Sequence, residues 1–98
     1  MKRLGYNISV NNYTASQVVP REKNCNGFMA TNIGDTAVTV NGKILFPSAT
    51  PLTVQGDSVS IGGNEEELYL GLIRIAFALL PGLTPQIEII QKFYLDPE

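Results

Sequence analysis

The length, composition and charge of the chain exclude several classes of protein. Its 98 residues are 44% hydrophobic and only 16% charged, and the formal net charge is −2. We predict one domain over residues 1–98, because a chain of this length buries roughly enough surface for a single core. A charge so close to zero does not attract nucleic-acid phosphates, so we expect no nucleic-acid binding. Soluble domains are usually about 25% charged, so this surface must contain many uncharged groups or be covered by another subunit.

The sequence also lacks the residues on which most catalytic and metal sites depend. It contains no histidine, which removes the commonest general base and the usual zinc ligand. Cys25 is the only cysteine, so we interpret it as an ordinary loop or half-buried thiol. Asp57 and the run Glu65–Glu67 do not follow the alternating ligand pattern of a calcium loop. We therefore predict no enzymatic activity, no cofactor and no metal site.

Neither export nor membrane insertion is indicated. Residues 1–10 include two basic side chains but no apolar stretch of the kind that forms the core of a signal peptide, so we expect no secretory signal. The longest apolar run, residues 68–80, is interrupted by Arg74 and is too short to cross a bilayer as a helix.

The first quarter of the chain begins with a strand pattern. Leu4, Tyr6, Ile8 and Val10 alternate with small or polar residues, which predicts a strand with one buried face. Asn11 and Asn12 then favour a turn, and a short second segment, residues 13–19, ends before Pro20. Residues 1–26 are compatible either with ordered strands or with a partly extended arm that reaches a neighbouring subunit.

Turn residues divide the middle of the chain into short strands. The turn Asn41-Gly42 lies between alternating hydrophobic residues, which is the strongest short-range signal for a hairpin. It predicts that residues 43–46 fold back on residues 36–40. Further strands are expected at residues 27–33, 52–54 and 58–61. Turns that recur this often are typical of a sandwich or barrel.

The C-terminal third suggests a long hairpin. Residues 68–80 form an apolar run, a Pro-Gly-Leu-Thr-Pro segment follows, and residues 86–95 alternate again. Residues 65–80 also carry apolar side chains near helical spacing after three glutamates, so a helix is the alternative. Gly71 and the β-branched isoleucines favour the strand. The predicted fold is thus all-β: a compact antiparallel β-sandwich or jelly-roll-like domain with a long C-terminal hairpin.

Both faces of the strand predicted at residues 68–80 are apolar, although a small antiparallel sandwich needs to bury only one of them. We assign one face to the core, and Arg74 interrupts it: Leu68, Leu70, Leu72, Ala76, Ala78 and Leu80. Arg74 is expected to pair with a carboxylate such as Glu88 across the hairpin; the alternatives are a pair with a group of another subunit and a role in binding a ligand. The opposite face, with the margin of the next strand, is the predicted interface: Tyr69, Ile73, Ile75, Phe77, Leu79, Ile90 and Tyr94.

One stretch resembles a known class of proteins. Residues 31–47 read T-N-x-G-x-x-x-V-x-V-N-G-x-x-L-x-P, and residues 89–95 resemble a closing strand. Both are similar to small structural proteins of tailed bacteriophages, which serve as capsid decoration, head-fibre or tail components. The resemblance implies a β domain of the virion, made in the bacterial host cytoplasm, that associates with itself and with other virion proteins and has no enzymatic activity.

Two functions remain open at this point. The first is a structural protein that forms a homo-oligomer or docks on a larger assembly through the predicted interface. The second is a monomeric ligand- or carbohydrate-binding β module, which would use the tyrosines and the loop at residues 62–67.

Overall fold

The computed structural model describes residues 5–47, 56–63, 67–78 and 81–95. Over these residues the chain forms two antiparallel four-stranded sheets and no helix, which confirms the predicted all-β class. Sheet A has the order β1-β8-β3-β6, formed by Tyr6–Tyr13, Ile87–Tyr94, Cys25–Asn32 and Ser58–Gly62. Sheet B has the order β2-β7-β4-β5, formed by Gln17–Val18, Arg74–Phe77, Val38–Val40 and Lys43–Leu45.

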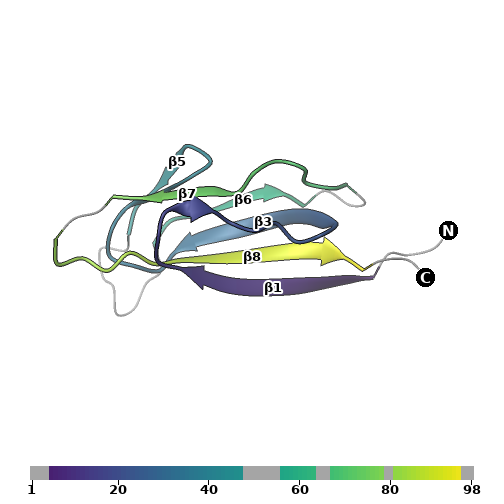
Figure 1. Ribbon diagram of the computed structural model, residues 1–98, viewed down its shortest axis with the longest axis horizontal. Coiled ribbons are helices and arrows are strands. Elements are labelled where there is room, and N and C mark those ends of the chain that lie inside the picture. The colour runs from purple at the N-terminus through teal and green to yellow at the C-terminus, as the bar shows by residue number, and fades with distance from the viewer. Residues whose placement is uncertain (1–4, 48–55, 64–66, 79–80, 96–98) are drawn as a thin grey trace.

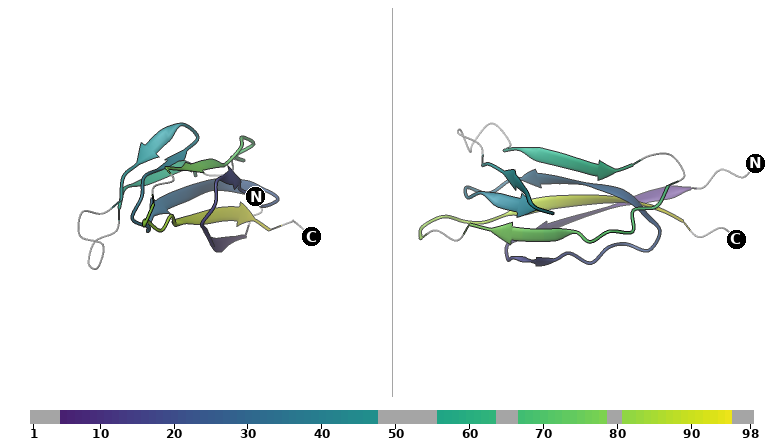
Figure 2. Two further views of the ribbon diagram at one scale, coloured as in Figure 1. Left: turned by 60° about the vertical axis from the view of Figure 1, so that its left-hand side comes forward. Right: turned by 90° about the horizontal axis from the view of Figure 1, so that it is seen from above.

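The two sheets pack face to face (Figures 1 and 2), and the buried side chains of both form one core. Alternate residues of each central strand point inward, as the two-residue period of a strand requires. In sheet A the strands β3 and β8 supply Phe28, Ala30, Ile87 and Ile89, all buried. Sheet B and the segments beside it complete the core with Val19, Val38, Val40, Leu45, Ile73, Ile75 and Phe77.

The predicted Asn-Gly hairpin is confirmed. Asn41 and Gly42 have φ values of 49° and 88°, the left-handed conformations that this kind of turn requires. Strand β4 pairs with β5 from Val38 opposite Leu45 to Val40 opposite Lys43. Because the turn residues themselves dictate this geometry, local sequence was sufficient to predict it.

The predicted C-terminal hairpin is not found among the described residues. Strand β7 pairs with β2 and β4 in sheet B, whereas β8 pairs with β1 and β3 in sheet A. Residues after the Pro81-Gly82 segment bond instead to the loop between β3 and β4: the amides of Ile33 and Gly34 donate to the Gln86 carbonyl over 3.2 and 3.0 Å. The connection therefore carries the chain from one layer to the other, and the buried side chains of β7 and β8 belong to the same core.

Three further strand predictions, one from each third of the chain, can be compared with the structure. The strand predicted at residues 68–80 is correct in type, but among the described residues of this range β7 covers only Arg74–Phe77. Residues 6–13 pair along their whole length with β8, so this part of the chain is an ordered strand. The strand expected at residues 52–54 lies outside the described residues.

Asn32 joins the two layers at the end of β3. Its side chain is fully buried, and its Nδ2 donates to the carbonyls of Thr36 and Leu45 over 2.9 and 3.0 Å. Its Oδ1 accepts the Gly34 N–H at 3.0 Å. A buried amide is stable only when its donors and acceptors are satisfied, and here the satisfied bonds link sheet A to the β4–β5 hairpin of sheet B.

Candidate functional site

The structure corrects the choice of interface face on β7. Ile73, Ile75 and Phe77 are only 0%, 2% and 8% exposed within the single chain and belong to its core. Their side chains are therefore not available to another subunit. The residues assigned to the core face are on the outside instead: Leu68, Leu70 and Leu72 are 49%, 75% and 55% exposed, and Ala76 is exposed as well. Arg74 shares this outer face, and its charge was the signal that marked the face as exposed.

The other predicted interface residues do not gather on one surface. Tyr69 packs against the core from the segment before β7, with its ring 5.5 Å from that of Phe28 in an edge arrangement. Ile90 is half-buried on the outer face of sheet A, and Tyr94 is buried. Leu79 lies outside the described residues. The predicted pairing of Arg74 with Glu88 is also not formed, because these residues belong to different sheets.

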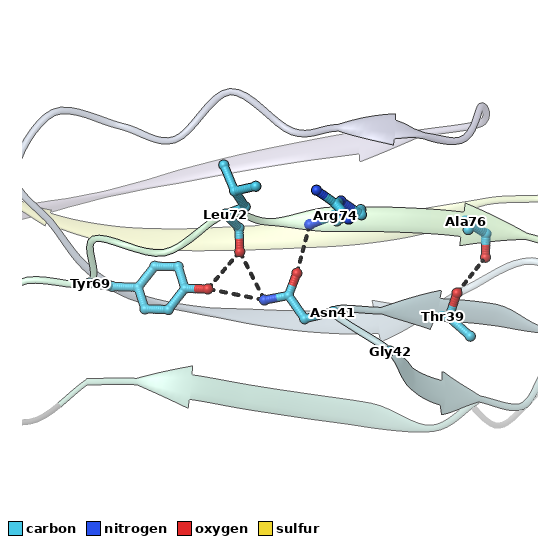
Figure 3. A pocket seen from close by; sticks show the side chains of 7 residues that line it. All are labelled: Thr39, Asn41, Gly42, Tyr69, Leu72, Arg74 and Ala76. Carbon is cyan, nitrogen blue, oxygen red and sulfur yellow. Dashed lines mark hydrogen bonds between the residues drawn. The ribbon is translucent and has the colours of Figure 1, made fainter.

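An open groove of about 660 Å³ lies on the outer face of sheet B (Figure 3). Strand β7 supplies Arg74 and Ala76, and the other lining residues are Thr39, Asn41, Gly42, Tyr69 and Leu72. The register places Ile44 of β5, Thr39 of β4 and Ala76 of β7 in one row across the sheet. Ile44 is 51% exposed, so this row extends the apolar surface beyond the groove.

The polar groups of the groove are mostly bonded to one another (Figure 3). The Asn41 Nδ2 donates to the Tyr69 hydroxyl and to the Leu72 carbonyl over 3.0 and 2.8 Å. The Tyr69 hydroxyl donates to the same carbonyl over 2.6 Å, and the Asn41 Oδ1 accepts the Arg74 backbone N–H at 2.8 Å. These bonds hold the hairpin turn against the segment before β7, so their role is structural. The exposed Arg74 guanidinium is the charged group that the groove presents.

The outer face of sheet A carries a second apolar group. Val10 lies opposite Ile90, and Ile90 lies opposite Met29, so these three form a row across β1, β8 and β3. Val10 is 57% exposed and Met29 39%. Tyr6 and Ile8 extend this row along β1, at 58% and 52% exposure. The sequence pattern had predicted that this face of β1 is buried; it is instead turned to the outside.

The tyrosines are divided between the two sheets. Tyr69 lines the groove of sheet B, whereas Tyr6 and Tyr94 lie on sheet A beside Lys92, whose ammonium is 4.5 and 5.9 Å from their ring centroids. These contacts are cation–π interactions, which orient the lysine along the sheet. The aromatic groove expected of a carbohydrate-binding module is not formed by the tyrosines that the structure describes.

Cys25 is buried, at 2% exposure, with its Sγ directed to the Gly27 carbonyl over 3.5 Å. Desolvation by burial raises the pKa of this thiol, and nearby Arg21 opposes only part of the effect. The thiolate is the reactive form of cysteine, and folding lowers both its population and its accessibility at Cys25. We therefore predict that an aromatic disulfide reagent at mildly alkaline pH modifies the native protein at least about tenfold more slowly than the urea-unfolded chain. Equal rates in the two states would contradict this placement of the thiol.

The same pKa shift predicts how stability depends on pH. A thiol whose pKa is raised by folding remains protonated in the native state where the unfolded chain already loses its proton. The contribution of the thiol to the free energy of unfolding is therefore constant at pH values below the pKa of the unfolded thiol. It becomes destabilising as the pH rises through that pKa towards the higher pKa of the folded state.

In the described part of the chain, no three Cys, Asp or Glu side chains lie close enough together to hold a metal ion. No helix there has the length and apolarity that spanning a membrane requires. Comparisons with protein-family models, with curated proteins and with solved structures gave no match, so the case for a function rests on the chain's own residues.

Proposed function

We propose that this protein is a non-enzymatic structural subunit that associates with copies of itself or docks on a larger assembly. The observation that carries the proposal is the exposure of large apolar side chains on the outer faces of both sheets. Isolated exposed apolar residues are normal, but contiguous apolar patches on a monomer commonly mark interaction surfaces. Here Val10, Ile90 and Met29 adjoin in one row, and Leu72 and Ala76 line one groove.

The composition supports the same proposal. With only 16% charged residues, the chain has few side chains that would keep these faces separated from other protein surfaces. The outer face of sheet A carries Lys92 and Glu88 on its central strand, and the outer face of β7 carries Arg74. Apolar rows with a small number of charges at their margins suit a protein interface better than a small-molecule site.

The virion is the setting that we propose for this subunit. The supporting observation is the resemblance of residues 31–47 to small structural proteins of tailed bacteriophages. In this chain the resembling stretch spans the end of β3 and the whole β4–β5 hairpin. In this setting the subunit is made in the host cytoplasm and its partners are itself and other virion proteins.

The mass of the protein in solution tests the proposal. Sedimentation velocity over the micromolar range is expected to show species larger than one chain, with the larger species favoured at higher concentration. Leu72→Asp, at an exposed position in the segment before β7 that lines the groove, is expected to leave the fold intact and to show whether the groove takes part. A monodisperse monomer at every concentration would refute self-association. Docking on a different protein would then be the remaining form of the proposal.

A further inference from the structure

Strand β1 is an open edge of sheet A. It pairs only with β8, and no other described strand lies beyond it (Figure 1). The Leu95 N–H donates to the Gly5 carbonyl over 2.9 Å, which identifies the odd-numbered residues as those bonded to β8. Even-numbered residues such as Ile8 and Val10 therefore direct their N–H and C=O groups away from the sheet. The Ile8 N–H accordingly donates to the Oδ1 of neighbouring Asn7, at 2.9 Å.

This edge has none of the features that usually prevent strands from pairing with other chains. Natural edge strands are short, or carry charges, prolines or bulges. β1 is eight residues long, and its sequence YNISVNNY contains no charged residue and no proline. The edge strands of sheet B differ: β2 has two residues, and β5 has three and includes Lys43.

The residues of β1 are arranged almost symmetrically about Ser9. Reading outward from it in both directions gives a β-branched residue, Ile8 or Val10, and then an asparagine, Asn7 or Asn11. In an antiparallel pair with a second copy centred on Ser9, each Ile8 lies opposite a Val10 and each Asn7 opposite an Asn11. The Ile8–Val10 pairs are then the hydrogen-bonded ones, and they use the backbone groups that β1 directs outward.

Ser9 has an unsatisfied group at the centre of this symmetry. Its hydroxyl oxygen is buried and has no hydrogen-bond partner among the described residues. Pairing about Ser9 brings this hydroxyl beside the same hydroxyl of the second copy, at a non-hydrogen-bonded position, where side chains approach most closely. A hydroxyl both donates and accepts, so the two groups can satisfy each other once each serine rotates about its Cα–Cβ bond from the buried position towards the edge.

We propose that two copies of this protein pair antiparallel through β1, about a two-fold axis at Ser9, to form one continuous eight-stranded sheet. The inference rests on the proposed function, since it names the edge and the partner for self-association. We assign a second copy of this chain to the β1 edge because an identical antiparallel strand places matching residues opposite each other on both sides of Ser9. With no charge on the strand, the symmetric pairing places no like charges opposite each other. It also joins the exposed Tyr6, Ile8 and Val10 of the two copies into one apolar strip.

Paired charges test both the edge and its register. Ile8 and Val10 are 52% and 57% exposed, so the monomer should tolerate charged residues there. In the double variant Ile8→Lys with Val10→Lys, each of the two symmetry-related pairs between positions 8 and 10 consists of two lysines. The dimer dissociation constant of this variant is expected to be about tenfold or more higher than that of the matched variant Ile8→Lys with Val10→Glu. The matched variant places lysine opposite glutamate twice. Circular dichroism and melting curves establish that both variants are folded.

A cross-link provides a second measurement. Non-hydrogen-bonded residues of an antiparallel pair have Cα atoms about 4.5 Å apart, which lies within the range of disulfides. Ser9→Cys is therefore expected to form a disulfide-linked dimer on mild oxidation, whereas Asn12→Cys, away from the axis, is not. Native Cys25 is buried and does not compete.

The outcomes separate this inference from the proposed function. If the native protein self-associates but the two charge variants dissociate equally, or the Ser9 and Asn12 variants cross-link equally, the β1 edge is refuted while self-association stands. If the native protein is monomeric at every concentration and the Ser9 variant does not cross-link, then both the pairing through β1 and the proposed self-association are refuted.

Discussion

Replacing Ile75 by aspartate is expected to unfold the protein. Ile75 is 2% exposed and projects from β7 into the core between the sheets. A carboxylate there loses its hydration and gains no partner, so the expected cost exceeds about 4 kcal/mol, against a total stability of about 5–15 kcal/mol for a typical domain. Circular dichroism and urea unfolding at neutral pH measure the effect.

Ala76 provides the matched control for this substitution. It is the next residue of the same strand and points to the opposite, exposed face. Ala76→Asp is therefore expected to change the free energy of unfolding by less than about 1 kcal/mol. A folded Ile75→Asp variant that merely dissociates into smaller species would contradict the core assignment and return Ile75 to a subunit interface.

Replacing Asn32 by alanine is expected to have the second largest effect. The substitution removes the Nδ2 group that donates to the carbonyls of Thr36 and Leu45, in a position with no exposure to water. The Gly34 N–H keeps its bond to the Gln86 carbonyl, so the main loss is at the two carbonyls. Buried acceptors that lose a donor cost about 1–3 kcal/mol each, which gives about 2–6 kcal/mol in total.

Urea unfolding of Asn32→Ala and of Asn11→Ala separates this loss from a general effect of removing an asparagine. Asn11 is exposed on β1, so its substitution is expected to stay within about 0.5 kcal/mol of the native protein. The Asn32 variant should show a lower midpoint with an unchanged slope, because stability falls but the surface exposed on unfolding does not change. Equal midpoints for the two variants would mean that the bonds between the layers contribute little.

The elements that local chemistry specifies were predicted well. The Asn41-Gly42 hairpin requires only two residues with positive φ between alternating strands, and all of that information lies within ten residues. Strand character was also predicted over most of residues 6–13, 25–32 and 87–94. The turn expected at Asn11 and Asn12 was wrong, because β1 continues through both residues to Tyr13.

The C-terminal hairpin was wrong for a physical reason that applies to any pair of amphipathic strands. A strand needs one apolar face whether it pairs edge to edge within a sheet or stacks across the core from a strand of the other sheet. The patterns of β7 and β8 satisfy both arrangements equally. Backbone bonds of Ile33 and Gly34 to Gln86 decide between them, and alternation carries no information about such long-range bonds.

The proposed association site could be predicted only in part. The residues of β1, their alternation and their symmetry about Ser9 are visible in the sequence. Their accessibility is not, because it depends on β1 lying at the edge of sheet A, with no described strand beyond it. The alternation of residues in β1 suggested that Tyr6, Ile8 and Val10 form a buried face, but in the folded chain these three side chains are exposed.

By itself the sequence determined that this chain is an all-β domain, where most of its strands run, where one hairpin turns, and that it contains no histidine. Tertiary structure decided which apolar face of each strand is covered, because burial depends on what lies opposite a strand and not on the strand's own residues. For β7 the facing sheet covers Ile73, Ile75 and Phe77; for β1 no described strand covers the apolar face, and its edge remains available for the second copy that we propose.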